Sequence, residues 1–340
     1  MAKRPVPPPP VEPGRFLELV DGFSRVRVTV FGDLLADEFI YGEVARVSRE
    51  APVLILNYDS TEIVPGGAGN AANNVAALGG TAVAVGVAGD DDAGRRLIEA
   101  MRRSVDVRAI VRPRGSRTPT KTRILAGGVH SAKQQVVRID RAAAVPLTDR
   151  DRELVRKRLL AAAARSNALI VSDYGGGLVT PALAAEAERA AGGGTVLVDS
   201  RYALLKFRGM TACTPNESEL EQLFGVRIGE NVRVLEKAGR ALLARVRAAA
   251  VLVTRGSRGM ALFERDRPTL HIPIFGTDQI ADVTGAGDTV IATMTLALAA
   301  GATFYEAARL ANYAGGIVVM KRGTATVTAA ELGQAIMSDR

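Results

Sequence analysis

The order of apolar and polar positions gives the second half of the chain a regular rhythm. From about residue 149, helix-forming stretches alternate with short apolar stretches, among them ALIVS at 168–172 and TVLVDS at 195–200. Two further helices are predicted over residues 285–300 and 304–320. Apolar strands that alternate with helices form parallel sheets whose two faces are both covered by helices. The pattern therefore predicts an α/β fold.

The first half contains similar elements and two segments that do not fit this rhythm. RVRVTVFGD (25–33) alternates and then becomes apolar, which predicts a strand, and PGGAGNAANNVAALGG (65–80) runs from a glycine turn into an alanine-rich helix. The segments at about 39–64 and 117–140 are rich in β-prone residues without helical periodicity. We expect them to form a small sheet, the lid, that projects from a main domain spanning residues 25–335.

Composition narrows the class of protein. Hydrophobic residues make up 47% of the 340 positions, which suits a sizeable core and excludes wholesale disorder. Residues 1–24 begin with a proline-rich run and are expected to form a flexible tail. There is no membrane-spanning apolar run and no secretory leader, and Cys213 is the only cysteine, so we expect a cytoplasmic protein without a disulfide.

Histidine content and charge exclude two further classes. The two histidines, His130 and His271, lack metal-ligand spacing, so neither a zinc site nor a histidine-based triad is expected. The net charge is +8, but basic residues are spread along the chain and aromatic residues make up only 4%. A solvated surface with a pocket for an anionic substrate explains this charge better than nucleic-acid binding does.

Polar residues follow several predicted strands and should share one edge of the sheet. Ligands of open α/β sheets bind outside the carboxyl ends of the strands. The residues that close these strands or follow them closely are Asp33, Asp173, Asp199, Asn216 and Thr254. Chemistry is expected along this rim.

The stretch ADVTGAGDTV (281–290) places Asp288 directly after a glycine turn and before an apolar helix. Glycines leave backbone N–H groups unobstructed at a helix start, where the helix dipole adds to an anion site. An aspartate beside such a site suits a general base, which takes a proton from a hydroxyl while the amides hold a phosphoryl group. The alternative is that Asp288 only caps the helix.

A second polar group follows the glycine turn of PGGAGNAAN. Asn70, Asn73 and Asn74 have helical spacings that place them on or near one face. Amides are poor helix formers but hydrogen-bond well to sugar hydroxyls, and Asp33 could accept hydrogen bonds from two hydroxyls. A polar, solvated helix face is the alternative.

Nucleotide-binding motifs are weak when taken singly. The sequence contains no G-x-x-x-x-G-K-[ST], which excludes a P-loop kinase, and no convincing dinucleotide-binding fingerprint after a strand. TRGSRG (254–259) ends a predicted strand with a glycine-spaced turn that suits nucleotide phosphates.

Four motifs together, in this order, resemble those of the PfkB (ribokinase-type) carbohydrate kinases. They are the Gly66-Gly67 to Gly89 segment, N-x-x-E at 216–219, T-x-G-x-x-G at 254–259 and DVTGAGD, with Thr293 where alanine or glycine is usual. The resemblance covers roughly residues 25–332. It implies a ribokinase-like three-layer sandwich with a mostly parallel central sheet and a small β lid. It also implies ATP-dependent phosphorylation of a sugar hydroxyl with Mg²⁺.

The resemblance further implies a role for each matching residue. Asp288 would be the base, and the amides of Gly285, Ala286 and Gly287 the anion hole. The sugar would be held by Asp33, Gly66, Gly67, Asn70 and Asn74. The nucleotide would be bound by Asn216, Glu219, Thr254, Gly256, Gly259 and Asn312. Glu219 would also hold Mg²⁺ through water, and Asp282, near Thr284, a monovalent cation such as K⁺. Lids of this kind often pair, which implies a homodimer.

Within this family the chain looks most like the heptose-7-phosphate kinases of lipopolysaccharide-precursor synthesis. The likeness rests on YGEVARVSREAPV, TKTRIL with QQVVRID, SDY, TPNESE and a late K-R-G-T. Asp199-Ser200-Arg201 departs from the usual Asp-Pro-Lys, which leaves a fructose, ribose or nucleoside kinase as the alternative. The cytidylyltransferase-like domain often fused behind such kinases is missing from this sequence, so a following nucleotidyl transfer would need another protein.

A substrate that already carries a phosphate needs a cationic partner, and the planar fork of arginine bonds two phosphate oxygens. The candidates are Arg46, Lys121, Arg123 and Arg138 in the predicted lid and Arg201 after a rim aspartate. Solvated strand residues are the alternative for any one of them. As a group they favour a sugar phosphate, with a heptose 7-phosphate converted to its 1,7-bisphosphate as the leading candidate. A binding protein that has lost turnover is less consistent with the intact Asp288 and its glycine loop.

Overall fold

The structure, a computed structural model, describes residues 11–127, 133–142, 147–276, 282–321 and 323–339. An eight-stranded main sheet forms its centre. In spatial order the strands are β12 (Leu270–Ile272), β11 (Met260–Glu264), β10 (Ala250–Thr254), β9 (Ala212–Cys213), β8 (Thr195–Ser200), β7 (Ala168–Asp173), β1 (Arg27–Gly32) and β4 (Thr81–Val85). The strands from β10 to β4 run parallel, whereas β11 and β12 pair in antiparallel fashion.

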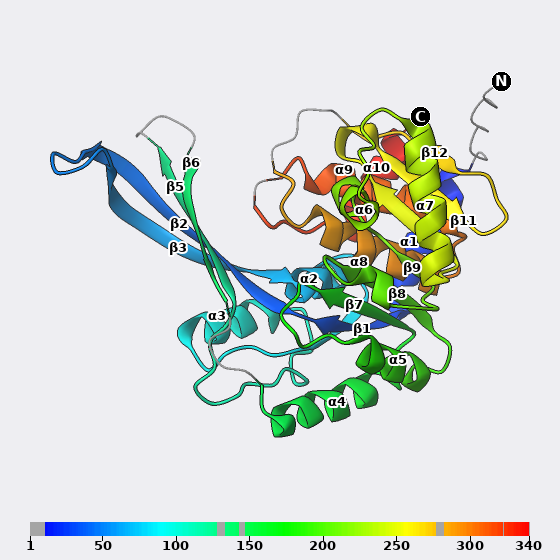
Figure 1. Cartoon of the computed structure of the whole chain (residues 1–340), viewed down its shortest axis with the longest axis horizontal. Coiled ribbons are helices and arrows are strands. Elements are labelled where there is room, and N and C mark those ends of the chain that lie inside the picture. Colours follow the sequence, from blue (N-terminus) through cyan, green and yellow to red (C-terminus); the bar gives the residue numbers. More distant parts are fainter. Residues whose placement is uncertain (1–10, 128–132, 143–146, 277–281, 322, 340) are drawn as a thin grey trace.

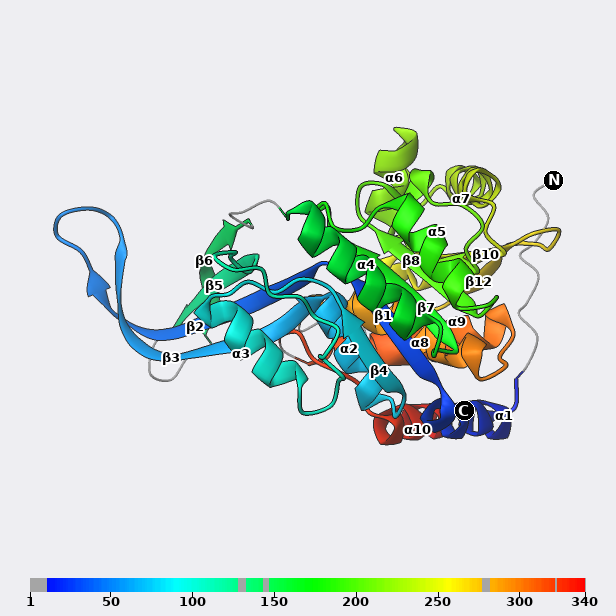
Figure 2. The same cartoon turned by 90° about the horizontal axis from the view of Figure 1, so that it is seen from below.

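Helices cover both faces of this sheet (Figures 1 and 2). One face packs against α1 (Pro13–Gly22), α2 (Ala68–Ala77), α3 (Asp92–Met101), α8 (Ala286–Ala299), α9 (Phe304–Val318) and α10 (Ala329–Ser338). The other packs against α4 (Asp149–Ala163), α5 (Pro181–Ala190), α6 (Glu217–Phe224) and α7 (Val232–Val246). Successive residues of β7 enter opposite cores, Ile170 the first and Val171 the second, as the pleat of a doubly covered strand requires. The predicted three-layer α/β sandwich is confirmed.

Four strands form a second sheet that projects from the main domain (Figure 1). In spatial order they are β3 (Leu54–Gly67), β2 (Leu34–Val47), β5 (Thr120–Gly127) and β6 (Gln134–Arg141). β2 is antiparallel to β3 and parallel to β5, and β6 is antiparallel to β5. The two β-rich segments predicted from the sequence thus pair with each other in one separate sheet, which we call the lid sheet.

Two of the points where the chain passes between the main domain and the lid sheet are neighbours in space. Asp33 is the single residue between β1 and β2, and β3 runs directly into α2 at Gly67. The carbonyl oxygen of Asp33 accepts a hydrogen bond from Ala68 N–H at 3.1 Å. Gly67 has φ +57°, and a β-carbon there would lie 2.7 Å from that oxygen, so only glycine fits. The crossings place Gly67 in the lining of the cavity described below and leave Asp33 buried at the base of the lid.

The predicted flexible tail is wrong for residues 13–22, which form α1. Phe16, Leu19, Val20 and Phe23 are all buried at spacings of three, four and seven, the pattern of a helix with one apolar face. α1 lies beside α10 (Figure 2). The proline run before it obscured this pattern, and residues 1–10 lie outside the described part. No helix in the described ranges is long and apolar enough to cross a membrane.

Candidate active site

A cavity of about 730 Å³ lies where the lid sheet meets the carboxyl ends of the main-sheet strands. Four of the five predicted rim residues line it: Asp173, Asp199, Asn216 and Thr254. Asp33, the fifth, is buried at the base of the lid and does not belong to the lining. The rule that sites gather at the carboxyl ends of parallel strands therefore located the cavity correctly.

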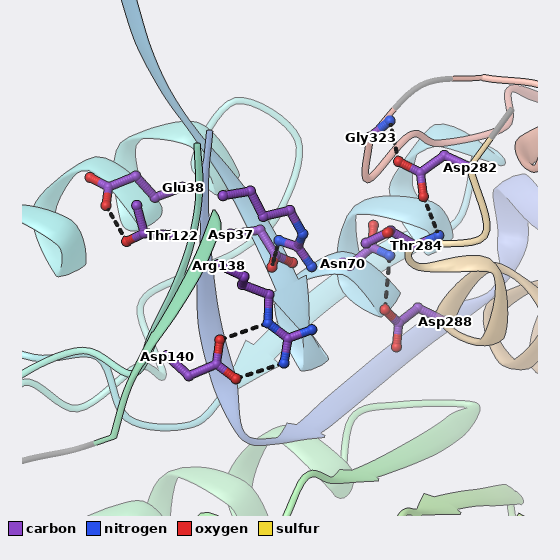
Figure 3. A network of polar contacts seen from close by, with 11 residues as sticks. Asp37, Glu38, Asn70, Thr122, Arg138, Asp140, Asp282, Thr284, Asp288 and Gly323 are labelled. Carbon is purple, nitrogen blue, oxygen red and sulfur yellow. Dashed lines mark hydrogen bonds and ion pairs between the residues drawn. The ribbon is translucent and has the colours of Figure 1, made fainter. Parts of the chain in front are cut away.

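Asp288 lies at the wall of this cavity and is buried, with 3% of its surface exposed. Its Oδ2 accepts a hydrogen bond from Asn70 Nδ2 at 2.9 Å (Figure 3), and its Oδ1 accepts one from the Tyr174 hydroxyl at 3.1 Å. Burial raises the pKa of Asp288 to about 7, and these two hydrogen bonds partly oppose that rise. A carboxyl group with such a pKa can accept a proton near neutral pH.

The prediction that Asp288 caps its helix is wrong. The N-cap of α8 is Gly285, with φ +80°, and Asp288 lies three residues further on, within the first turn. Its carboxylate is turned away from the helix amides toward Asn70 and Tyr174. First-turn N–H groups have no intrahelical acceptor, so the turn can offer amides to an anion, although Ala286 N–H here donates to the Val283 carbonyl oxygen at 3.3 Å.

Asn70 and Asn74 form a buried chain of amides that leads to Asp288. Asn74 Nδ2 donates to Asn70 Oδ1 at 3.1 Å, and the Thr289 hydroxyl donates to Asn74 Oδ1 at 3.0 Å. Asn70 is 1% exposed and Asn74 0%, and neither lines the cavity. Asn70 contacts Asp288, and the contact of Asn70 and Asn74 with a sugar stays a prediction. Both belong to α2, whose polar face is buried against α8 rather than solvated.

The carboxylate of Asp33 is held by the loop after β7. Its Oδ2 accepts hydrogen bonds from the backbone N–H groups of Tyr174 and Gly176, each at 2.9 Å. Burial raises the pKa of Asp33, and the charge of Asp173 acts in the same direction, against the two backbone hydrogen bonds. A β-carbon at position 176 would lie 2.7 Å from Asp33 Oδ1, so glycine is required for the loop to wrap the carboxylate.

Four of the five predicted cations line the cavity: Lys121, Arg123, Arg138 and Arg201. Arg46 does not, because it lies on the exposed outer part of β2. Arg123 forms an ion pair with Asp37 at 2.5 Å between two largely buried side chains. Arg138 forms a bidentate pair with Asp140, at 2.8 and 2.7 Å (Figure 3).

Lys121 and Arg201 differ from the other two cavity cations. Within the described ranges, neither forms an ion pair. Lys121 Nζ lies 5.4 Å from the centre of the Tyr174 ring, and the Arg201 guanidinium lies over the ring of Tyr202. Burial lowers the pKa of Lys121, and the charges of Arg201 and Arg138 lower it further despite Asp37 nearby. Two cations that repel each other across a cavity favour an anion between them.

The predicted nucleotide residues also line the cavity. Asn216 and Glu219 form a capping box at the start of α6, with hydrogen bonds of 2.8 and 2.9 Å. The turn after β10 contains Gly256 and Gly259, both with positive φ. A β-carbon at 259 would lie 2.1 Å from the Ile272 carbonyl oxygen, so this turn passes very close to the strand behind it.

Asn312 of α9 completes this wall, and its Nδ2 donates to the Pro273 carbonyl oxygen at 2.8 Å. The six residues that we predicted around the nucleotide thus come from the start of α6, the end of β10, the following turn and α9. The structure brings them to one cavity wall, and their contact with a nucleotide stays a prediction.

Sequence reasoning missed three residues on this wall. Glu217 accepts hydrogen bonds from Arg255 Nε at 2.6 Å and from Arg258 at 2.5 Å, and all three line the cavity. The Glu217 and Arg255 side chains are 10% and 7% exposed, so this ion pair is buried. These three residues lie within the motifs TPNESE and TRGSRG, at positions where the motifs allow any residue. Tyr174, in SDY, and Asp37 of the lid were missed for the same reason.

Carboxylates on the cavity wall fit a hard divalent cation. Asp199 and Glu219 both line the cavity, and burial together with the charge of Glu219 raises the pKa of Asp199 well above its usual range. A bound cation reduces the repulsion between two neighbouring carboxylates. Carboxylate oxygens together with waters are the usual ligands of Mg²⁺. No three histidine, cysteine, aspartate or glutamate side chains of the described chain form a ready metal cluster. Mg²⁺ would therefore rely on water and nucleotide oxygens as well.

Asp282, predicted beside a monovalent cation, has both oxygens occupied by backbone donors. Oδ1 accepts from Thr284 N–H at 2.9 Å and Oδ2 from Gly323 N–H at 3.1 Å (Figure 3). Burial would raise the pKa of Asp282, but the hydrogen bonds from Thr284 and Gly323 outweigh it and lower the pKa. The carboxylate ties two loops together, and the cation stays a prediction.

A parallel sheet with a projecting β lid, and a cavity between them, define a fold of the ribokinase type. Arabidopsis thaliana ribokinase with ribose and ATP superposes with a TM-score of 0.70 at 20% identity, covering 92% of this chain and 98% of the other. Escherichia coli phosphofructokinase-2 with fructose-6-phosphate gives a TM-score of 0.71 at 20% identity, with the same coverage.

Residues 27–330 match the pfkB family carbohydrate kinases. The chain belongs to this family and is a sugar kinase. It is 40% identical over 321 residues to "Bifunctional protein HldE" of Pelobacter propionicus, and 43% identical over 318 residues to the protein of that name in Halorhodospira halophila. These alignments cover 92% and 93% of this chain but only 64% of each relative.

Proposed function

We propose that this kinase transfers the γ-phosphate of ATP to a sugar phosphate, with heptose 7-phosphate and its anomeric hydroxyl as the leading candidates. The observation that carries the proposal is the position of Asp288. It is a buried carboxylate with a pKa of about 7, it adjoins the open first turn of α8, and it shares a cavity with two unpaired cations.

The mechanism follows from this arrangement. Asp288 takes the proton of the sugar hydroxyl as the hydroxyl oxygen forms its bond to the γ-phosphorus and the bond to the ADP oxygen breaks. The amides of Gly285, Ala286 and Gly287 donate to the phosphoryl oxygens, for which Ala286 N–H exchanges its 3.3 Å hydrogen bond to the Val283 carbonyl oxygen. A β-carbon at 287 would meet nothing within 4 Å, so there is room for the phosphoryl group beside this turn. When bound near Asp199 and Glu219, Mg²⁺ would neutralise phosphate charge.

The two unpaired cations support a substrate that already carries a phosphate. Lys121 reaches the cavity from the lid, and Arg201 reaches it from the residue after β8. The resemblance to heptose-7-phosphate kinases and the HldE relatives agree with this substrate class. Fructose, ribose or a nucleoside is the alternative.

The test compares a phosphorylated and a free sugar, namely heptose 7-phosphate with heptose and fructose 6-phosphate with fructose. Arg201→Gln and Lys121→Met should each lower kcat/KM for the phosphorylated sugar by about ten- to a hundredfold, as loss of an ion-assisted hydrogen bond does. Arg46→Gln is the matched control and should behave as wild type. A better rate with the free sugar, or equal losses for both sugars, would overturn the phosphosugar assignment.

We also propose that two copies pair through the lid sheet. Large apolar side chains are exposed on β3, on β6 and at the β2–β3 end: Val47, Val53, Leu54, Tyr58, Val137 and Ile139. Such a group on an otherwise polar sheet favours a protein partner, here a second copy. Sedimentation should show a dimer that Val137→Lys with Tyr58→Asp dissociates, and an unchanged mass for the double variant would contradict the pairing.

A further inference from the structure

Tyr174 contacts three separate parts of the site. Its hydroxyl lies 3.1 Å from Asp288 Oδ1, and its backbone N–H donates to Asp33 Oδ2 at 2.9 Å. Lys121 of the lid lies over its ring, 5.4 Å from the ring centre. Tyr174 directly follows the last residue of β7, so the parallel sheet fixes the position of its backbone. The lid and the main domain therefore both constrain where the Tyr174 hydroxyl points.

The hydroxyl can act only as a donor toward an ionised base. Burial and the charge of Asp288 raise the pKa of Tyr174 well above its ordinary value, so the hydroxyl keeps its proton. Asn70 donates to the other oxygen of Asp288. Each oxygen of the carboxylate thus receives one hydrogen bond, which leaves its remaining lone pairs for the sugar hydroxyl.

We infer that Tyr174 is a positioning residue for the proposed base, holding the Asp288 carboxylate ionised and turned toward the cavity. Two hydrogen bonds from fixed donors favour the charged form, against the burial that favours the neutral form. Asn70 approaches from α2 and Tyr174 from the end of β7, so together they fix the plane of the carboxylate. This inference rests on the proposed role of Asp288.

Two other roles for Tyr174 make different predictions. A tyrosine that only fills space would leave the titration of Asp288 unchanged when its hydroxyl is removed. A tyrosine that only bonds the sugar would raise KM for the sugar at every pH without moving the titration. A positioning role moves the titration itself, and it does so without any substrate present.

The first experiment measures the titration of Asp288 directly. Aspartate labelled with ¹³C at the carboxyl carbon is followed by NMR against pH, and the Asp288 signal is identified by its loss in Asp288→Asn. Tyr174→Phe keeps the ring and the Lys121 contact, and should raise the titration midpoint by about half to one pH unit, the effect of losing one hydrogen bond. Tyr202→Phe, the same change in a nearby exposed tyrosine without a bond to Asp288, should leave the midpoint unchanged. An unchanged midpoint in Tyr174→Phe overturns the inference.

A second variant keeps the test decisive if Tyr174→Phe folds poorly. Replacing Tyr174 with 3-fluorotyrosine keeps the ring and makes the hydroxyl a stronger donor, so the midpoint should fall instead of rise. A midpoint that rises or stays constant in the fluorinated protein would also overturn the inference.

Activity separates this inference from the proposed function. In Tyr174→Phe the acidic limb of kcat/KM should move with the NMR midpoint, so the loss at pH 6 exceeds the loss at pH 9 by about three- to tenfold. If the NMR midpoint moves but the rate profile does not, Tyr174 holds the carboxylate and Asp288 is not the base. If Asp288→Asn is inactive but the Tyr174→Phe midpoint is unchanged, the base stands and only the role of Tyr174 fails.

Discussion

The side-chain amide of Asn70 lies 2.9 Å from Asp288 Oδ2, although 218 positions separate the two residues in the chain. This contact brings the helix after the Gly66-Gly67 turn onto the first turn of α8. The two most distinctive motifs of the sequence therefore meet at one carboxylate. The asparagine supports the carboxylate that we propose as the base, a role that does not require contact with the sugar.

Asn70→Ala should remove one donor from Asp288 and raise its pKa further above 7. Because the base must be ionised, kcat/KM should fall by about ten- to a hundredfold near pH 6 and by much less at pH 9. Asn73→Ala on the same helix is the matched control, since no hydrogen bond between Asn73 and Asp288 occurs in the described structure. Equal losses for the two variants would contradict the role given to Asn70.

Alanine substitutions at two glycines of the same turn separate two effects. Gly285→Ala tests backbone strain, and Gly287→Ala tests the filling of open space. Gly285 has φ +80°, and a β-carbon there would lie 2.5 Å from Asn70 Nδ2, so alanine should both strain the backbone and displace the amide from Asp288. We expect the melting temperature and kcat to fall together, kcat by at least about tenfold. At Gly287 alanine meets nothing and favours the helix, so the melting temperature should hold or rise.

A fall in kcat for Gly287→Ala without loss of stability would indicate that the phosphoryl group occupies the open space. Normal turnover in Gly285→Ala would contradict the dependence of the base on Asn70. Thermal unfolding and steady-state kinetics on the two variants are sufficient.

Asp288→Asn should abolish most turnover, lowering kcat by at least about 10²-fold, and should also change how stability depends on pH. Burial raises the pKa of Asp288 from 3.8 to about 7, so the folded state binds this proton more tightly than the unfolded state. The stability contributed by that proton is present below pH 4 and is lost as the pH rises through about 7. Asparagine does not titrate, so the variant should gain melting temperature over wild type between pH 5 and pH 8.

Asp21→Asn, at an exposed position of α1, is the control and should show a constant difference from wild type. A melting-temperature difference for Asp288→Asn that stays flat with pH would mean that the folded state does not raise this pKa.

Glu217→Ala should destabilise the nucleotide wall, because it leaves the buried guanidinium of Arg255 without its carboxylate. Breaking a buried ion pair costs about 3–5 kcal/mol of the free energy of unfolding. Glu153→Ala, whose side chain is 48% exposed and pairs with Arg156 and Lys157, should cost at most about 1 kcal/mol. Urea unfolding of both variants is the measurement, and similar losses would show that the Glu217 pair is not effectively buried.

Much of the fold was visible in the sequence because its signals are local. Alternating helices and apolar strands after residue 149 specify a doubly covered parallel sheet without knowledge of any contact. The strand ends then locate the cavity, since parallel strands share one carboxyl edge. The two β-rich segments were also recognisable in the sequence. Only the structure shows that β2 pairs with β5, although β3, α2, β4 and α3 lie between them in the chain.

The details of the site depend on contacts between distant segments and could not be predicted in the same way. Asp288 looks like a helix cap in sequence, and only the positive φ of Gly285 moves the helix start three residues earlier. The helix of Asn70 and Asn74 is so rich in alanine that its buried and solvated faces cannot be told apart by polarity. Tyr174 carries no spacing signal, because its partners lie on β2's junction, β5 and α8.

The junction at Asp33 makes the angle of the lid and the occupancy of the sugar site thermodynamically inseparable. The residue predicted to bind the sugar is the only link between β1 and β2, and its carboxylate is held by the same loop that carries Tyr174. If Asp33 binds the sugar as predicted, any dependence of its hydrogen bonds on the lid orientation would couple that orientation to sugar affinity, and the coupling would be reciprocal. Substitutions far out on the lid, such as those at a dimer contact, can therefore change sugar affinity without touching the sugar.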